Sequence, residues 1–204
     1  MRKFTMRSLL RLSMVVLLLM AISFQMNAQN NESDEPIITI KTNAYKNLGS
    51  SNAFSLVLGT IDAGNIIEVD TGFGKEEYEV NPAVFNELEG GIVGTFIPCS
   101  VSDEGIVRIY GDPEKIDYIN ASGCYIETIE FPKLVNLDIL EMSHNELKSI
   151  DLTNQTKLQA IYMSDNTFAK ETPLVIGYKP DLAILEVSII DWFDPNFNLS
   201  DYPK

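Results

Sequence analysis

The sequence predicts a mainly β protein with irregular coil, in which a small β-rich domain caps a short solenoid of about four coils built on parallel strands. Three observations carry this prediction: an apolar spacing that recurs every 21 residues, β-branched runs separated by turn residues before it, and an apolar N-terminal segment. The predicted organisation is a signal peptide at 1–28, a flexible leader at 29–35, the β-rich domain at 36–104, and the solenoid with a C-terminal cap at 105–204.

The N-terminal segment has the layout of a secretory signal peptide. An apolar run at 12–24 follows four cations and precedes polar residues after Ala28, the cations being Arg2, Lys3, Arg7 and Arg11. A membrane anchor is the alternative, but this run is shorter than the roughly 20 residues that a spanning helix needs. We therefore expect export, to the medium, the cell surface, the periplasm or the outer envelope, with no transmembrane segment after signal removal.

The charge balance limits the class of partner. Without residues 1–28 the chain keeps 11 Lys and Arg against 29 Asp and Glu, a formal charge of −18. Such a surface repels nucleic-acid phosphates and anionic membranes, so nucleic-acid binding is excluded. The acidity suits solubility outside the cell, and a cationic ligand is the alternative explanation.

Residues 36–104 alternate short apolar runs with turn residues, as in IITIKT, FSLVLGTI, NIIEVDTG and EEYEV. This pattern is typical of a small β-rich domain. The segment PAVFNELEGG at 82–91 predicts at most one helical turn, which its two glycines end. The strand GIVRIYG at 105–111 is expected to cap the first coil, because a solenoid end otherwise exposes its apolar interior.

The repeat is clearest in LDILEMSHNELKSIDL at 137–152, which fits the pattern L-x-x-L-x-L-x-x-N-x-L of leucine-rich repeats. In that pattern a short strand turns into a coil with a buried Asn. The framework positions are Leu137, Leu140, Met142, Asn145 and Leu147, with a second copy at Leu158, Ile161, Met163, Asn166 and Phe168, and an upstream copy at Ile116, Ile119, Ala121, Cys124 and Ile126.

In chain order, the copy at Leu158 is the third. A fourth copy begins 24 residues after it, at Leu182, Leu185, Val187, Ile190 and Trp192. The three extra residues fall between Phe168 and Leu174, and an insertion confined to one loop is what stacked repeats tolerate. An aromatic cluster then predicts a C-terminal cap, with a binding patch as the alternative, and consists of Trp192, Phe193, Phe197 and Tyr202.

The residues between framework positions are expected on an exposed concave face. These candidate ligand-binding residues are Asn120, Glu141, Tyr162 and Glu186, followed by a serine row at Ser122, Ser143, Ser164 and Ser188. A polar, partly acidic strip with one aromatic suits a peptide or a glycan. For the serines, of which Ser143 and Ser164 are also candidate contacts, capping of the turn backbone is the alternative. The interior Asn145 and Asn166 are expected to be structural.

No catalytic site, metal site or cofactor is predicted. The only histidine, His144, lies at a variable position of the repeat, and no nucleophile elbow, HExxH helix or phosphate loop is present. Cys99 and Cys124 have no zinc spacing. Export permits a disulfide between them, but Cys124 stands at the buried Asn position, which favours a free, buried thiol.

Residues 116–192 resemble the short leucine-rich repeats of internalin-like secreted bacterial surface proteins. The segments IITIKTN, IIEVDTGFG and GIVRIYGD further resemble the N-terminal β domain of exported leucine-rich-repeat proteins of Bacteroidetes. The resemblance implies a non-enzymatic surface or secreted binding protein. We expect a monomer that binds a protein or a glycan; adhesion is one such role, although four strands make only a short concave face for it. A structural component of the cell envelope is the first alternative, and a carbohydrate-active enzyme is the second.

Overall fold

The computed structural model describes residues 35–47, 53–88, 90–168 and 174–188. These residues belong to one compact unit, Glu35–Lys204. The predicted signal peptide, most of the leader and the C-terminal aromatic cluster lie outside the described residues, so they stay predictions. In the described part of the chain, no helix is long and apolar enough to cross a membrane.

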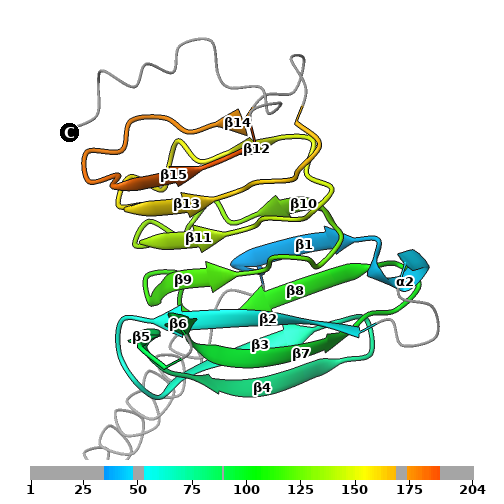
Figure 1. The fold of residues 1–204 in the computed structure, drawn as a ribbon. Helices are drawn as coiled ribbons and strands as arrows, with labels where there is room; N and C mark the ends of the chain where they lie inside the picture. The colour runs from blue at the N-terminus through cyan, green and yellow to red at the C-terminus, as the bar shows by residue number, and fades with distance from the viewer. Residues whose placement is uncertain (1–34, 48–52, 89, 169–173, 189–204) are drawn as a thin grey trace, which may run out of the picture. The chain divides into compact units, whose positions relative to one another are not determined.

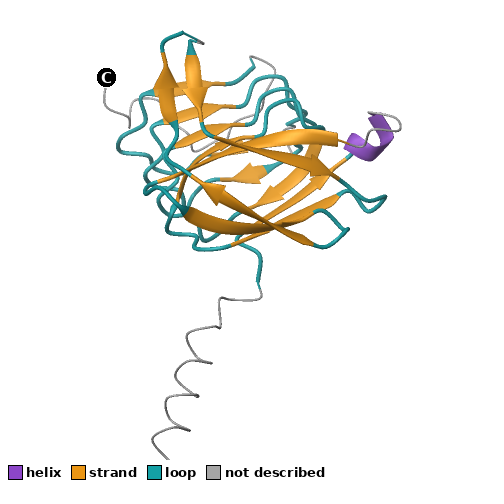
Figure 2. Ribbon diagram, turned by 90° about the horizontal axis from the view of Figure 1, so that it is seen from below, coloured by secondary structure: helices purple, strands orange, loops and turns teal. Residues whose placement is uncertain are grey.

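The described residues are almost all strand and turn, with a single turn of helix (Figures 1 and 2). The elements are β1 (Ile38–Thr42), α2 (Ala44–Asn47), β2 (Ala53–Thr60), β3 (Asn65–Asp70), β4 (Lys75–Val80), β5 (Val84–Asn86), β6 (Gly91–Val93), β7 (Thr95–Ser100), β8 (Ile106–Tyr110), β9 (Ile116–Asn120), β10 (Ile126–Glu130), β11 (Ile139–Glu141), β12 (Ile150–Asp151), β13 (Ala160–Tyr162), β14 (Leu174–Val175) and β15 (Ile184–Glu186).

Two large sheets contain most of these strands. The five-stranded sheet has the order β10-β1-β8-β3-β4 and is antiparallel throughout. The six-stranded sheet has the order β15-β13-β11-β9-β2-β7. Its strands β9, β11, β13 and β15, here called the repeat strands, are parallel, whereas β2 and β7 are antiparallel to their neighbours. Two small ladders, β12-β14 and the hairpin β5-β6, complete the fold.

The predicted fold class, a solenoid of parallel strands with a separate cap, is wrong. The sheets are mixed, and seven of the eleven strand pairings are antiparallel. The physical reason is that the first repeat offers two strand edges, on β9 and β10, and both are paired by strands from before the repeats. Strands from both sides of the predicted boundary at 104/105 thus share both large sheets.

The described residues have one continuous apolar core. Alternation along each strand sends every second side chain into it. Leu58 of β2 pairs with Ile119 of β9, which pairs with Leu140 of β11, and all three are at most 1% exposed. The five-stranded sheet adds Ile40 and Val107 to the same cluster. Segment 82–91, where a helical turn was expected, instead forms the hairpin β5-β6.

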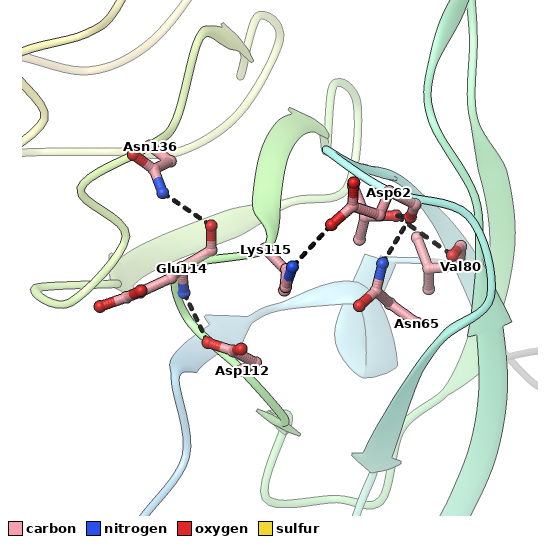
Figure 3. Close-up of polar contacts among 8 residues, drawn as sticks. Asp62, Asn65, Val80, Asp112, Glu114, Lys115 and Asn136 are labelled. Carbon is pink, nitrogen blue, oxygen red and sulfur yellow. Dashed lines mark hydrogen bonds and ion pairs between the residues drawn. The ribbon is translucent and has the colours of Figure 1, made fainter.

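Polar contacts connect the loop before β9 to its neighbours on both sides (Figure 3). Lys115 Nζ lies 2.6 Å from Asp62 Oδ2, in the turn between β2 and β3. Asn136 Nδ2 donates to the carbonyl oxygen of Glu114 at 2.7 Å, and Asp112 Oδ1 accepts the Glu114 N–H at 2.9 Å. The loop therefore joins the antiparallel part of the sheet to the next repeat.

Candidate functional site

The outer face of the six-stranded sheet, opposite its buried Leu58–Ile119–Leu140 side, contains the predicted contact residues. The pairing places Asn120 beside Glu141, Glu141 beside Tyr162, and Tyr162 beside Glu186. Glu186 is exposed and the other three are half-buried. The 21-residue period, and the longer last interval, thus align these side chains across four strands, although nothing in the structure tests that they bind a ligand.

Glu141 is held in place by two neutral donors from β9. Tyr118 Oη donates to Glu141 Oε1 at 3.0 Å, and Asn120 Nδ2 donates to Oε2 at 2.9 Å. Asn120 is itself oriented, because its Oδ1 accepts the Ser122 N–H at 3.0 Å. The carboxylate therefore has a fixed direction, and neither donor neutralises its charge.

Burial affects the pKa of both partners in this contact. It raises the pKa of Glu141, while the hydrogen bond from Tyr118 acts in the opposite direction. Burial also raises the pKa of Tyr118, which is only 2% exposed. Tyr118 therefore stays a hydrogen-bond donor at neutral pH. Sequence reasoning missed Tyr118, although alternation from Asn120 places it on the same face.

The serine row lies at the turns between successive repeats, and the side chain of Ser188 caps a turn backbone there. The carbonyl oxygens of Ser143 and Ser164 accept N–H groups from the preceding repeat, those of Gly123 and His144, at 2.9 and 2.8 Å. Ser188 Oγ accepts the N–H of Asp165 at 2.6 Å. The serines therefore stand where successive turns are hydrogen-bonded to each other, and their role as ligand contacts stays a prediction.

The buried asparagines are structural, as predicted. Asn145 is 5% exposed, and its Oδ1 accepts the N–H groups of Cys124 at 3.1 Å and Ile126 at 3.0 Å. Its Nδ2 donates to the carbonyl oxygens of Ala121 and Met142, both at 2.9 Å. Asn166 repeats the arrangement one repeat later, where its Oδ1 accepts the N–H of Leu147 at 3.1 Å. Each amide joins two successive turns.

Both cysteines are free and buried, which confirms that prediction. Cys124 Sγ lies 3.3 Å from the carbonyl oxygen of Ser55 on β2, at the position that an Asn side chain fills in the next two repeats. Burial raises the pKa of Cys99 and of Cys124 to about 12. Because the thiolate is the reactive form, both thiols are inert at neutral pH.

His144, Asp165 and Ser188 are the described residues that most resemble a nucleophilic site, but their order is unsuitable. His144 Nδ1 lies 3.0 Å from Asp165 Oδ2, and Ser188 Oγ donates to Asp165 Oδ1 at 3.3 Å. The carboxylate lies between the other two groups, whereas activation of a hydroxyl needs the imidazole beside it. The prediction that the chain is not an enzyme stays a prediction.

Two aspartates at the start of the first two repeat strands were also missed: Asp117 lies in β9, and Asp138 immediately precedes β11. Asp117 and Asp138 stand 21 residues apart, and the Oδ1 atom of each is buried without a hydrogen-bond partner. Burial is the main cause that raises the pKa of both carboxyl groups. Each aspartate directly follows the first framework residue of its repeat, Ile116 or Leu137. The repeat pattern specifies no residue type at that position, so no sequence signal distinguished them.

A cleft of about 290 Å³ lies away from the candidate site, between β10 and β12. Its apolar lining includes Ile129, Phe131 and Ile150, and its rim carries Glu130 and Asp151. None of the predicted contact residues lines this cleft. It opens where two successive repeats separate, since β10 pairs with β1 and β12 with β14.

Comparison with known proteins leaves the family resemblance untested. No family model, curated protein or solved structure matches this chain. The resemblance to exported leucine-rich-repeat proteins therefore stays a prediction from the sequence.

Proposed function

We propose that this protein is exported and recognises a macromolecule, a protein or a glycan, through the outer face of its six-stranded sheet. The observation that carries the proposal is the alignment of Asn120, Glu141, Tyr162 and Glu186 on adjacent parallel strands. A regular scaffold that presents partly exposed polar and aromatic side chains in register offers a preorganised binding surface.

The electrostatics of Glu141 support the same proposal. Its two oxygens accept hydrogen bonds from Tyr118 and Asn120, so the side chain pays little rotamer entropy when a ligand binds. Among the ion pairs of the described residues, none involves Glu141 or Glu186. These charges are therefore available to a partner.

The test compares capture by residues 29–204 with capture by the triple variant Glu141→Ala, Tyr162→Ala, Glu186→Ala on arrays of extracellular proteins and of envelope glycans. A matched control, Phe73→Ala, Glu77→Ala, Glu79→Ala, removes one exposed aromatic and two exposed carboxylates from the β3–β4 side. We expect loss of capture in the first variant alone, with unchanged melting. Capture that both variants retain, or no capture by the wild type, contradicts the proposal and favours a structural role in the envelope.

A further inference from the structure

The aligned row of the candidate site continues beyond the repeats. Asn120 of β9 pairs with Val57 of β2, and Val57 pairs with Phe96 of β7. Phe96 is 62% exposed and Val57 is half-buried. The row therefore crosses six strands, from Phe96 to Glu186, and spans about 24 Å at roughly 4.8 Å per strand. One end of it is apolar and the other is acidic.

The hairpin β5-β6, which lies between β4 and β7 in the chain, is beside one end of β2 (Figure 1). The chain before the hairpin packs directly on Gly59 of β2. A Cβ atom added to Gly59 would lie only 2.6 Å from Ala83 Cβ, so there is no room for a side chain between them. The chain after the hairpin returns at Gly94, where an added Cβ would lie 2.6 Å from the Leu58 carbonyl oxygen and 3.0 Å from Val57 Cγ1. The hairpin thus stands next to the row.

The hairpin exposes apolar side chains beside the row. Val84 and Val93 form a cross-strand pair and are 59% and 37% exposed, and Phe85 is 65% exposed. Val84 and Val93 lie on one face of the hairpin and Phe85 on the other, because successive side chains of a strand alternate. The hairpin therefore adds exposed apolar side chains close to Phe96, and exposed apolar groups that gather at one place mark interaction sites. An aromatic or aliphatic side chain of a partner protein would gain free energy here, because its apolar surface and that of Phe96 would both leave water.

The acidic end favours a cation. Glu141 is half-buried and receives hydrogen bonds from neutral groups only, among the contacts of the described residues. A partly desolvated carboxylate without a counter-charge gains most from a Lys or Arg brought by a partner. The formal charge of −14 of the whole chain attracts such a partner at long range and opposes acidic ones.

We infer that this face binds an extended peptide segment of a partner protein, with an aromatic or large aliphatic side chain at one end and a Lys or Arg further along. The spacing follows from the sheet: Glu141 lies three strands from Phe96, about 14 Å, and Glu186 lies five strands away. At about 3.3 Å per residue, the basic residues stand about four and about seven positions after the apolar one. This inference rests on the proposed function and names its ligand class.

The test uses synthetic eight-residue peptides with residues 29–204, which keep every described element. The probe has Phe at its first position, Lys at its fifth and eighth, and Ser or Gly elsewhere. Matched peptides replace Phe by Ser, or both Lys by Gln. In fluorescence anisotropy we expect saturable binding of the probe, weakened about tenfold or more by either replacement, and reduced further by added salt.

Protein variants locate the contact. We expect Phe96→Ser to weaken the Phe-containing peptide and to leave the Ser-containing peptide unchanged. We expect Glu186→Gln to weaken the Lys-containing peptides and to flatten the salt dependence. The controls are Phe73→Ser, in the turn before β4, and Glu77→Gln, on β4, both at exposed positions. We expect them to change neither the affinity for the peptides nor its salt dependence.

Two outcomes overturn the inference: no saturable binding of the probe, or equal losses in the control variants. The array experiment described under the proposed function then distinguishes failure of the peptide inference from failure of the proposed function. If glycans are captured and the Glu141, Tyr162, Glu186 variant loses them, the proposed function stands and the peptide inference fails. If nothing is captured, both fail.

Discussion

The turns after β11 and β13 each depend on the amide of one buried asparagine, Asn145 and Asn166. Asn145 satisfies two N–H groups and two carbonyl oxygens that belong to two successive repeats. A buried backbone group that loses its partner keeps the full cost of desolvation. Cys124, at the same position of the first repeat, cannot supply these four bonds, and its turn is instead covered by β2.

We therefore expect Asn145→Leu to lower the free energy of unfolding by about 1 to 3 kcal/mol or more. Asn154→Leu, at an exposed position, is the matched control and should change it by less than about 0.5 kcal/mol. Urea denaturation followed by circular dichroism measures both. Equal stability of the two variants would contradict the role assigned to the buried amide.

Lys179 is a buried ammonium that was not singled out in the sequence. It is 0% exposed, and its Nζ donates to the carbonyl oxygen of Leu152 at 2.7 Å and to that of Ile176. Burial lowers its pKa to about 8, against an opposing effect of Asp151. Gln155 occupies the same position one repeat earlier, where its Nε2 donates to the Phe131 carbonyl oxygen at 3.2 Å.

The sign of the pH dependence follows from this lowered pKa. Between pH 8 and about 10.5 the unfolded chain binds more protons than the folded one, so this residue makes the free energy of unfolding rise with pH. This rise is at most about 1.4 kcal/mol per pH unit for one residue. We expect Lys179→Gln to abolish it without loss of stability at pH 7. Lys179→Met, which leaves both carbonyls without this donor, should lose stability at every pH. A constant difference between wild type and Lys179→Gln from pH 7 to 10, in urea denaturation, would refute the lowered pKa.

At the scale of elements, the hairpin β5-β6 depends on two places where backbones approach closely. Gly59 is the sharper one, because an added Cβ would also lie 2.9 Å from Tyr118 Cβ. Ordinary Cβ atoms do not approach other carbon atoms so closely, so the hairpin or β9 must move. Such a shift would disturb Tyr118, which orients Glu141.

Gly59→Ala is therefore expected to destabilise the fold by about 1 to 3 kcal/mol and to weaken binding at the outer face. Gly91→Ala is the control within the hairpin, because an added Cβ there meets nothing within 4 Å. Thermal melting and the peptide titration measure the two effects. Unchanged melting of Gly59→Ala would show that the hairpin is not packed on β2 as described.

For the whole molecule, the sequence predicted local order better than long-range pairing. The 21-residue period placed Glu141 beside Tyr162, and alternation placed Leu140 and Ile161 in the core. The sequence could not reveal that β2 continues the sheet of the repeats. The pairing of Val57 with Asn120 joins residues 63 positions apart, and such a pairing leaves no periodic signal. Phe96 and the hairpin were missed for the same reason.

This long-range pairing makes a prediction about the boundary at 104/105. A chain of residues 105–204 alone would leave β9 without β2 and β10 without β1, and would expose the core against which Leu56, Leu58 and Ile40 pack. Unpaired strand edges and uncovered apolar surface both oppose folding. We expect the fragment to lack a cooperative thermal transition that residues 29–204 show.

A point variant separates this coupling from a general effect of truncation. Leu58 is 0% exposed and pairs with Ile119, so Leu58→Asp places a charge at the junction between β2 and the repeat strands. If the two parts fold as one unit, hydrogen exchange in Leu58→Asp should accelerate at amides of β11 and β13 as well as β2. If those amides keep their protection, or the fragment 105–204 melts cooperatively, the repeats fold independently, and the strands before them only cover one side of a structure that is already stable.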